Sequence, residues 1–182
     1  QKDALDLIDG MKKLREAPIV DEEYRGPVLF SNDAASDMFF DLIVPNILGR
    51  RPAPGRPART TGAFASSYRA RVLPDFLSIV DDPTVETFAG RSLGGSYKVD
   101  DEGVPVAPVT VVNNGILTNY LIGRMPIRDF PASNGHGRAA GGGSTGPAPG
   151  NLFIRATRTS TREELKNQQP RTTPRWPGHA VE

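Results

Sequence analysis

Residues 109–122, VTVVNNGILTNYLI, contain two β-prone runs joined by Asn114-Gly115. An Asn-Gly pair accepts the positive φ values of a type I′ turn, so this stretch predicts a β-hairpin. Further strands are expected where apolar and β-branched residues cluster between turn residues. These are Gly26–Phe30, the 71–80 region with an interruption at Pro74, Ser96–Val99 and Asn151–Ile154.

Helices are expected on both sides of these strands. Between Asp3 and Glu16 an apolar residue recurs every third position from Leu5 to Leu14, which is typical of a one-sided helix. A second helix is predicted from about Ala34 to Ile47, with capping oxygens supplied by residues 31–33. Pro45 is expected to bend this helix or to end it early.

A last helix is expected to begin at Thr161, because Thr161 and Glu164 have the spacing of a capping box. The pattern predicts an α+β fold: a central antiparallel β-rich sheet with a β-hairpin and flanking helices. The chain begins with Gln1, which favours a fragment of a longer protein. We expect a helix over 1–19 leading in from a missing domain, one domain over 20–167 and an irregular tail over 168–182.

The composition excludes several function classes. Lys and Arg total 22 and Asp and Glu total 21, so a net charge of +1 gives no overall field that attracts nucleic acid or an anionic membrane. The absence of cysteine excludes disulfides, thiolate metal sites and cysteine nucleophiles within this sequence. No apolar stretch approaches the roughly 20 residues of a membrane span, so no membrane partner is expected.

One segment is locally basic. Residues 49–62, GRRPAPGRPARTTG, combine four arginines with three prolines and three glycines. A nucleic-acid patch and a solvated loop are the two interpretations. The loop is favoured, because no aromatic residue stands among the arginines to stack on a base.

Few residues could act as acids, bases or metal ligands. The two histidines are His136, which we expect to be a solvated loop residue or else a contact for an anionic ligand, and His179 in the tail. Acidic residues cluster at Asp81-Asp82 and at Asp100-Asp101-Glu102. Neighbouring acids more often form turns than chelating cages, so turns are favoured over an oxygen-only Ca²⁺ or Mg²⁺ site.

The segment from Ala139 to Gly146 is rich in glycine. Such backbone could surround a phosphate, but no lysine follows in the P-loop position and the Pro-Ala-Pro that comes next opens no helix. A flexible loop, or a backbone surface on which a peptide strand could lie, is favoured. No nucleophile elbow of the Gly-x-Ser-x-Gly type occurs in the sequence.

Several segments, in this order, resemble the PmbA/TldD (modulator of DNA gyrase, peptidase U62) family. The resemblance covers about residues 20–167, and proteins of that family are much longer than this chain. The segments are Glu23–Phe30, Arg71–Thr84, Asp100–Pro105, Asn114–Leu117 with Tyr120-Leu121, and Ser144–Gly146.

In the family's peptidase subunits, the strand that resembles Gly26–Phe30 leads into a helix with a His-Glu-x-x-x-His motif, which with a later cysteine holds zinc. This chain has Ser31-Asn32-Asp33-Ala34-Ala35-Ser36 there, give or take one residue. Ser31, Asn32 and Ser36 therefore mark a degenerate metal-site position. The resemblance implies a metal-free subunit without catalytic residues or cofactor, with zinc expected only in a partner subunit.

The same resemblance implies a cytoplasmic homo- or heterodimer with a family paralogue, which acts on unfolded peptide substrates. Extended peptides would be recognised by strand pairing. The alternative is an active hydrolase with an unfamiliar carboxylate site, which would use Asp81, Asp82, Asp100, Asp101 and His136. Nucleic-acid binding through residues 50–59 is a weaker third hypothesis. The residues expected to line the peptide cavity are Asp100, Asp101, Glu102, His136, Ser144 and Thr145.

Overall fold

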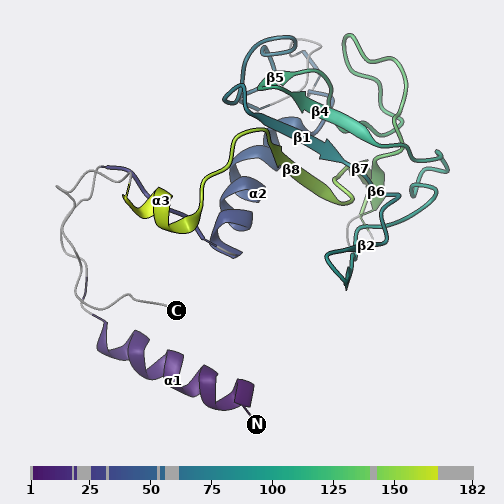
Figure 1. The fold of residues 1–182 in the computed structure, drawn as a ribbon. Coiled ribbons are helices and arrows are strands. Elements are labelled where there is room, and N and C mark those ends of the chain that lie inside the picture. The colour runs from purple at the N-terminus through teal and green to yellow at the C-terminus, as the bar shows by residue number, and fades with distance from the viewer. Residues whose placement is uncertain are drawn as a thin grey trace. The chain divides into compact units, whose positions relative to one another are not determined.

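The computed structural model describes residues 2–17, 19, 26–31, 33–52, 54–55, 62–139 and 143–167 (Figure 1). The chain divides into two units, one of residues 1–29 with 160–182 and one of residues 30–159. The predicted tail at 168–182 and most of the tip of the arginine-rich loop lie outside the described residues. No helix in the described ranges is long and apolar enough to cross a membrane.

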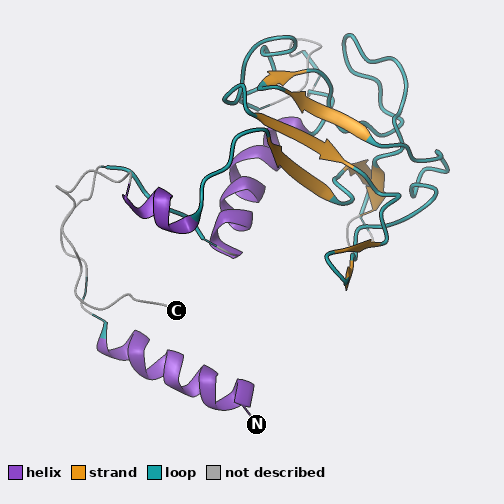
Figure 2. Ribbon diagram, in the orientation of Figure 1, coloured by secondary structure: helices purple, strands orange, loops and turns teal. Residues whose placement is uncertain are grey.

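The unit 30–159 is built on a four-stranded sheet in the order β5-β4-β1-β8 (Figure 2). All its neighbouring strands are antiparallel, which confirms the predicted fold class. The strands are β1 (Leu77–Asp81), β4 (Val109–Asn113), β5 (Ile116–Leu117) and β8 (Leu152–Ala156). Two-stranded ribbons pair β2 (Thr87–Phe88) with β3 (Arg91–Ser92) and β6 (Gly137–Ala139) with β7 (Thr145–Pro147).

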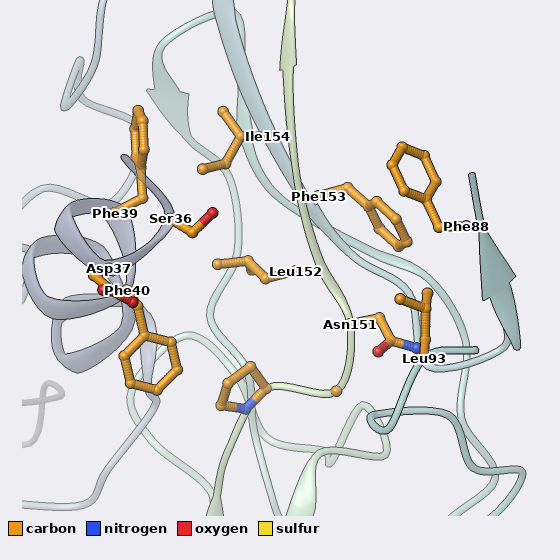
Figure 3. Close-up of a pocket in the computed structure, with 12 residues that line it drawn as sticks. Ser36, Asp37, Phe39, Phe40, Phe88, Leu93, Asn151, Leu152, Phe153 and Ile154 are labelled. Atoms are coloured by element: carbon orange, nitrogen blue, oxygen red, sulfur yellow. The ribbon is translucent and has the colours of Figure 1, made fainter. Parts of the chain in front are cut away.

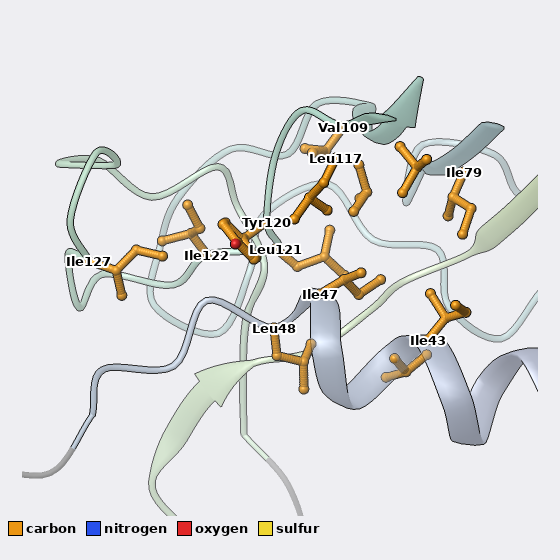
Figure 4. Close-up of a cluster of buried hydrophobic side chains, with 13 residues drawn as sticks. Ile43, Ile47, Leu48, Ile79, Val109, Leu117, Tyr120, Leu121, Ile122 and Ile127 are labelled. Carbon is orange, nitrogen blue, oxygen red and sulfur yellow. The ribbon is translucent and has the colours of Figure 1, made fainter. Parts of the chain in front are cut away.

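Helix α2 (Asp33–Ile47) packs its C-terminal half into the core of this unit (Figure 4). Ile43, Val44 and Ile47 are buried there. Pro45 does not end the helix, which continues to Ile47, so this prediction was wrong about an early end. The core also contains residues of β1, β4, β5 and the segment after β5: Ile79, Val109, Val111, Val112, Leu117, Tyr120, Leu121 and Ile122.

The other unit contains α1 (Lys2–Glu16) and α3 (Arg162–Asn167). The predicted capping box is confirmed at α3, where the amide of Thr161 donates to Glu164 Oε2 at 2.8 Å and the amide of Glu164 donates to Thr161 Oγ1 at 3.2 Å. Of the capping residues expected before α2, Asn32 lies outside the described residues.

The predicted hairpin is confirmed between β4 and β5. Asn114 and Gly115 have φ values of 46° and 78°, as a type I′ turn requires. Its second strand is shorter than expected, because the amides of Thr118 and Asn119 both turn to the carbonyl of Val111. The chain then leaves the ladder, and Leu121 forms a parallel bridge with Leu48 after α2.

Other strand predictions were wrong. Residues 26–30 are irregular and largely exposed, with Val28 at 60% and Phe30 at 44% exposure. Ser96–Val99 forms a single bridge, between Val99 and Pro105, in place of a strand. The glycine-rich segment was expected to be a loop, but its described flanks pair as β6 and β7. A strand needs a partner that supplies hydrogen bonds, and sequence periodicity does not reveal one.

We predict that Gly115→Ala destabilises the protein by more than about 1 kcal/mol. A Cβ at this positive φ would stand 2.2 Å from the carbonyl oxygen of Leu73. Gly103 is the matched control, because it has the same φ of 78° but no heavy atom within 4 Å of the place that a Cβ would take. Chemical denaturation should show a smaller loss for Gly103→Ala. Equal losses would mean that backbone strain alone accounts for the effect.

Candidate functional site

A pocket of about 550 Å³ lies beside β8 in the unit 30–159 (Figure 3). The first half of α2 forms one wall, and the strand with the residues just before it forms the floor. Phe88 lies against Phe153 at the other end, with ring centroids 5.4 Å apart. Most of the lining is apolar. The lining residues are Ser36, Asp37, Phe39, Phe40, Phe88, Leu93, Pro149, Gly150, Asn151, Leu152, Phe153 and Ile154.

Strand β8 stands at the edge of the sheet, and its hydrogen-bonding pattern can be assigned. The amide of Asp82 donates to the carbonyl of Asn151 at 2.9 Å, and the amide of Thr157 donates to the carbonyl of Phe76 at 2.9 Å. Because bonded pairs alternate along an antiparallel ladder, the odd-numbered residues of β8 bond to β1. Leu152 and Ile154 therefore direct their backbone N–H and C=O groups away from β1, towards the open edge.

The degenerate metal-site position adjoins this pocket. Ser36 lines it, Ser31 is exposed and Asn32 lies outside the described residues. Zinc sites are built from thiolate, imidazole and carboxylate donors, whereas this stretch supplies hydroxyls and the single pocket-lining carboxylate of Asp37. Within the described ranges no three His, Cys, Asp or Glu side chains come together in a way that could hold a metal ion. The described residues of this stretch therefore do not offer the donors of a zinc site.

The acidic stretch at 100–102 forms the predicted turn. The amide of Gly103 donates to the carbonyl of Asp100 at 3.0 Å. The buried carboxylate of Asp100 accepts the amides of Glu102, Val104 and Gly137 at 3.0, 2.8 and 2.9 Å. The carboxylate of Glu102 accepts the amide of Arg124. These acids therefore bind backbone amides of their own chain.

Asp101 joins the same turn to β6. Its Oδ2 accepts the amide of Ala139 at 2.7 Å and lies 3.3 Å from Nε of Arg138. Thr145 begins β7, the strand that pairs with β6, and Ser144 precedes it. Both residues are exposed. None of the six residues expected to line a peptide cavity lines the pocket beside β8.

The predicted solvent exposure of His136 was wrong. The residue is fully buried, and its Nε2 lies 3.0 Å from Oδ1 of Asp81, which is also fully buried. Asp81 is the last residue of β1, and the predicted turn begins one residue later, where Asp82 caps Thr84 through two hydrogen bonds. The hydrolase hypothesis thus gains a carboxylate–imidazole contact, although neither group is open to a substrate.

Tyr97 lies close to this buried pair. Its hydroxyl donates to the carbonyl of Gly135 at 3.2 Å, and the guanidinium of Arg138 stands over its ring at 4.1 Å. Burial raises the pKa of Tyr97 to about 12, with a further contribution from the negative charges of Asp81 and Asp100 and an opposing one from Arg138.

We predict that Tyr97 is the tyrosine responsible for ionisation near pH 12 in the folded protein. Its folded-state pKa is above the ordinary value of 10.0, so its contribution to stability is complete below pH 10 and is lost as the pH rises towards 12. An ultraviolet titration of tyrosinate in Tyr97→Phe should lose the last step of the wild-type curve. An unchanged last step would contradict the assignment.

Apart from Ser36, the pocket residues were not singled out as site residues from the sequence. One signal was available: Phe39 and Phe40 are adjacent on a helix, so both cannot face the same core. Phe40 is 58% exposed at the pocket wall. The local sequence does not show which strand packs beside this helix.

The comparisons with known proteins fit this architecture. The model of the PmbA/TldA metallopeptidase C-terminal domain matches residues 23–171, which is most of the chain. The chain belongs to the PmbA/TldD metallopeptidase family. It is 33% identical over 105 residues to a metalloprotease of Methanocaldococcus jannaschii, which covers 57% of this chain and 22% of that protein.

A second curated relative and a solved structure are also similar to the chain, the structure in fold alone. A metalloprotease TldD homologue of Buchnera aphidicola is 32% identical over 81 residues, or 44% of this chain and 16% of that protein. The crystal structure of TldE from Thermococcus kodakarensis aligns with a TM-score of 0.53 at 17% identity, over 79% of this chain and 29% of that one. The chain thus spans about a fifth of the length of these curated relatives.

Proposed function

We propose that this peptidase-family domain is a non-catalytic peptide-binding part of a peptide-processing complex. Zinc and hydrolysis would come from a PmbA/TldD paralogue, with which it would form a cytoplasmic dimer. The observation that carries the proposal is the open edge of β8 beside the apolar pocket. An exposed strand edge with pockets for alternate side chains is a recurrent means of binding an extended peptide.

The geometry supports such binding in two ways. The outward backbone groups of Leu152 and Ile154 can pair with a peptide backbone of any sequence. Their side chains lie on the same face of β8, towards α2, where Phe39 stands opposite Ile154 (Figure 3). Burial of an apolar peptide side chain in this space would stabilise the complex by roughly 25 cal/mol for each Å² of apolar surface removed from water.

The non-catalytic part of the proposal depends on donor chemistry. Ser31 and Ser36 cannot replace the imidazoles of the family's zinc motif, and the carboxylates of Asp100 and Asp101 accept backbone amides. Metal analysis of the full-length protein purified without its paralogue should therefore find less than stoichiometric zinc. Stoichiometric zinc together with turnover would support the hydrolase alternative.

We predict that Ile154→Pro weakens binding of an extended peptide by about tenfold or more, because one outward N–H donor is removed. The fold should persist, since proline is tolerated on an edge strand where its nitrogen does not bond to the neighbour. Fluorescence anisotropy with a labelled, unstructured heptapeptide that alternates valine and polar residues measures the affinity. Circular dichroism checks the fold.

Ile154→Val is the matched control, because it retains the N–H group and most of the side chain. It should bind the labelled peptide within about fourfold of wild type, since at most one buried methylene group is lost. Wild-type affinity in both variants would contradict strand pairing at β8. A loss in both would assign the binding to the side-chain pocket rather than to the edge.

A further inference from the structure

The two ends of the β6–β7 ribbon, which contains the glycine-rich segment, meet at a single carboxylate oxygen. Oδ1 of Asp81 lies 3.0 Å from Nε2 of His136, just before β6, and accepts the amide of Gly150, shortly after β7, at 2.9 Å. The carbonyl of His136 also accepts the amide of Ala148 at 3.0 Å. Asp81 therefore fastens both ends of the β6–β7 ribbon to the end of β1.

The other ring nitrogen of His136 also faces only oxygen atoms. Nδ1 lies 3.0 Å from the carbonyl oxygen and 3.1 Å from Oδ1 of Asn134. The orientation of that amide is fixed, because its Oδ1 accepts the amide of Ile122 at 2.8 Å and its Nδ2 donates to the carbonyl of Tyr120 at 2.7 Å. Turning the amide over would oppose donor to donor and acceptor to acceptor.

Both ring nitrogens thus face acceptors, and a neutral imidazole has only one N–H to donate. We infer that Asp81 and His136 form a buried carboxylate–imidazolium clamp, which holds the ends of the β6–β7 ribbon and thereby positions the pocket wall at Gly150. Oδ2 of Asp81 is buried and has no hydrogen-bond donor among the described residues. A carboxylate in that environment is stabilised by a positive charge in contact with it.

The neighbouring described groups do not supply this positive charge in place of His136. The hydroxyl of Tyr97 donates to Gly135, and the carboxylate of Asp100 is engaged by backbone amides. Arg138 pairs with Asp101 and covers the ring of Tyr97. The clamp is therefore a positioning unit: it touches neither the pocket space nor a ligand directly, and it acts through Gly150, which lines the pocket.

The test is a long-range ¹H–¹⁵N spectrum of the histidine rings in the full chain. His179→Gln removes the signals of the only other histidine. Both ring nitrogens of His136 should have ¹⁵N chemical shifts typical of nitrogen that carries a proton. In Asp81→Asn one of the two should have the shift of a nitrogen without a proton. The amides of Ala148 and Gly150 should also exchange with solvent about tenfold faster in Asp81→Asn.

Asp82→Asn is the matched control, since the adjacent carboxylate caps its own turn and does not contact His136. It should leave the ring spectrum and both exchange rates unchanged. A single unprotonated nitrogen in the His179→Gln protein would overturn the inference, and this result is decisive even if Asp81→Asn does not fold. Unaltered ring shifts and exchange rates in a folded Asp81→Asn protein would overturn it as well.

Discussion

Replacing His136 with alanine should lower the free energy of unfolding by about 3–5 kcal/mol, the usual cost of removing one partner of a buried ion pair. Both side chains are fully buried, so the carboxylate of Asp81 would remain in the core without its cation. Urea denaturation followed by circular dichroism measures the effect. The loss should exceed that of a typical substitution, which is about 1 kcal/mol.

A double-mutant cycle separates the charge from the cavity that alanine leaves. His136→Ala would leave the charge of Asp81 unpaired, and Asp81→Asn removes that charge. The double variant should therefore lose less stability than the sum of the two single losses. The non-additivity should reach roughly 1–3 kcal/mol for residues in direct contact. Additive losses would mean that His136 contributes only packing, and the ion pair would then have no energetic role.

The same pair shows what sequence reasoning could not reach. Asp81 and His136 are separated by 55 positions, and neither carries a local pattern that identifies the other. A histidine between two glycines resembles a loop residue because glycine-rich segments are usually solvated. It is buried where contacts distant in sequence meet, with Asp81 at the end of β1 and with the backbone of Ile122 and Ala148.

Features determined by neighbouring residues were predictable. The hairpin at Asn114-Gly115 and the capping box at Thr161 each depend on bonds between residues at most a few positions apart. Strands that need a distant partner were less certain: Asn151–Ile154 overlaps β8, whereas residues 26–30 form no strand. The carboxylates of Asp100 and Asp101 were correctly placed in a turn, but their amide partners on β6 were not foreseen.

Replacing Ile47 with alanine should cost about 2–5 kcal/mol of unfolding free energy, because the side chain is fully buried and the cavity would be only partly refilled. Ile47 lies where α2 meets the segment after β5: its carbonyl accepts the amide of Leu121 at 2.9 Å, and the amide of Gly49 donates to the carbonyl of Leu121 at 2.8 Å. These backbone bonds hold the end of the helix in place, so relaxation around the missing atoms is restricted.

Leu42 is the matched control on the same helix, since it is 62% exposed. Leu42→Ala should change stability by less than about 0.5 kcal/mol in the same denaturation experiment. Ile47→Ala should also weaken peptide binding beside β8, because α2 carries Ser36 and Phe39 at the pocket wall and Ile47 is one of the residues that bury the helix in the core. Equal stability losses in the two variants would contradict the packing of α2 described for this unit, and with it the pocket between that helix and β8.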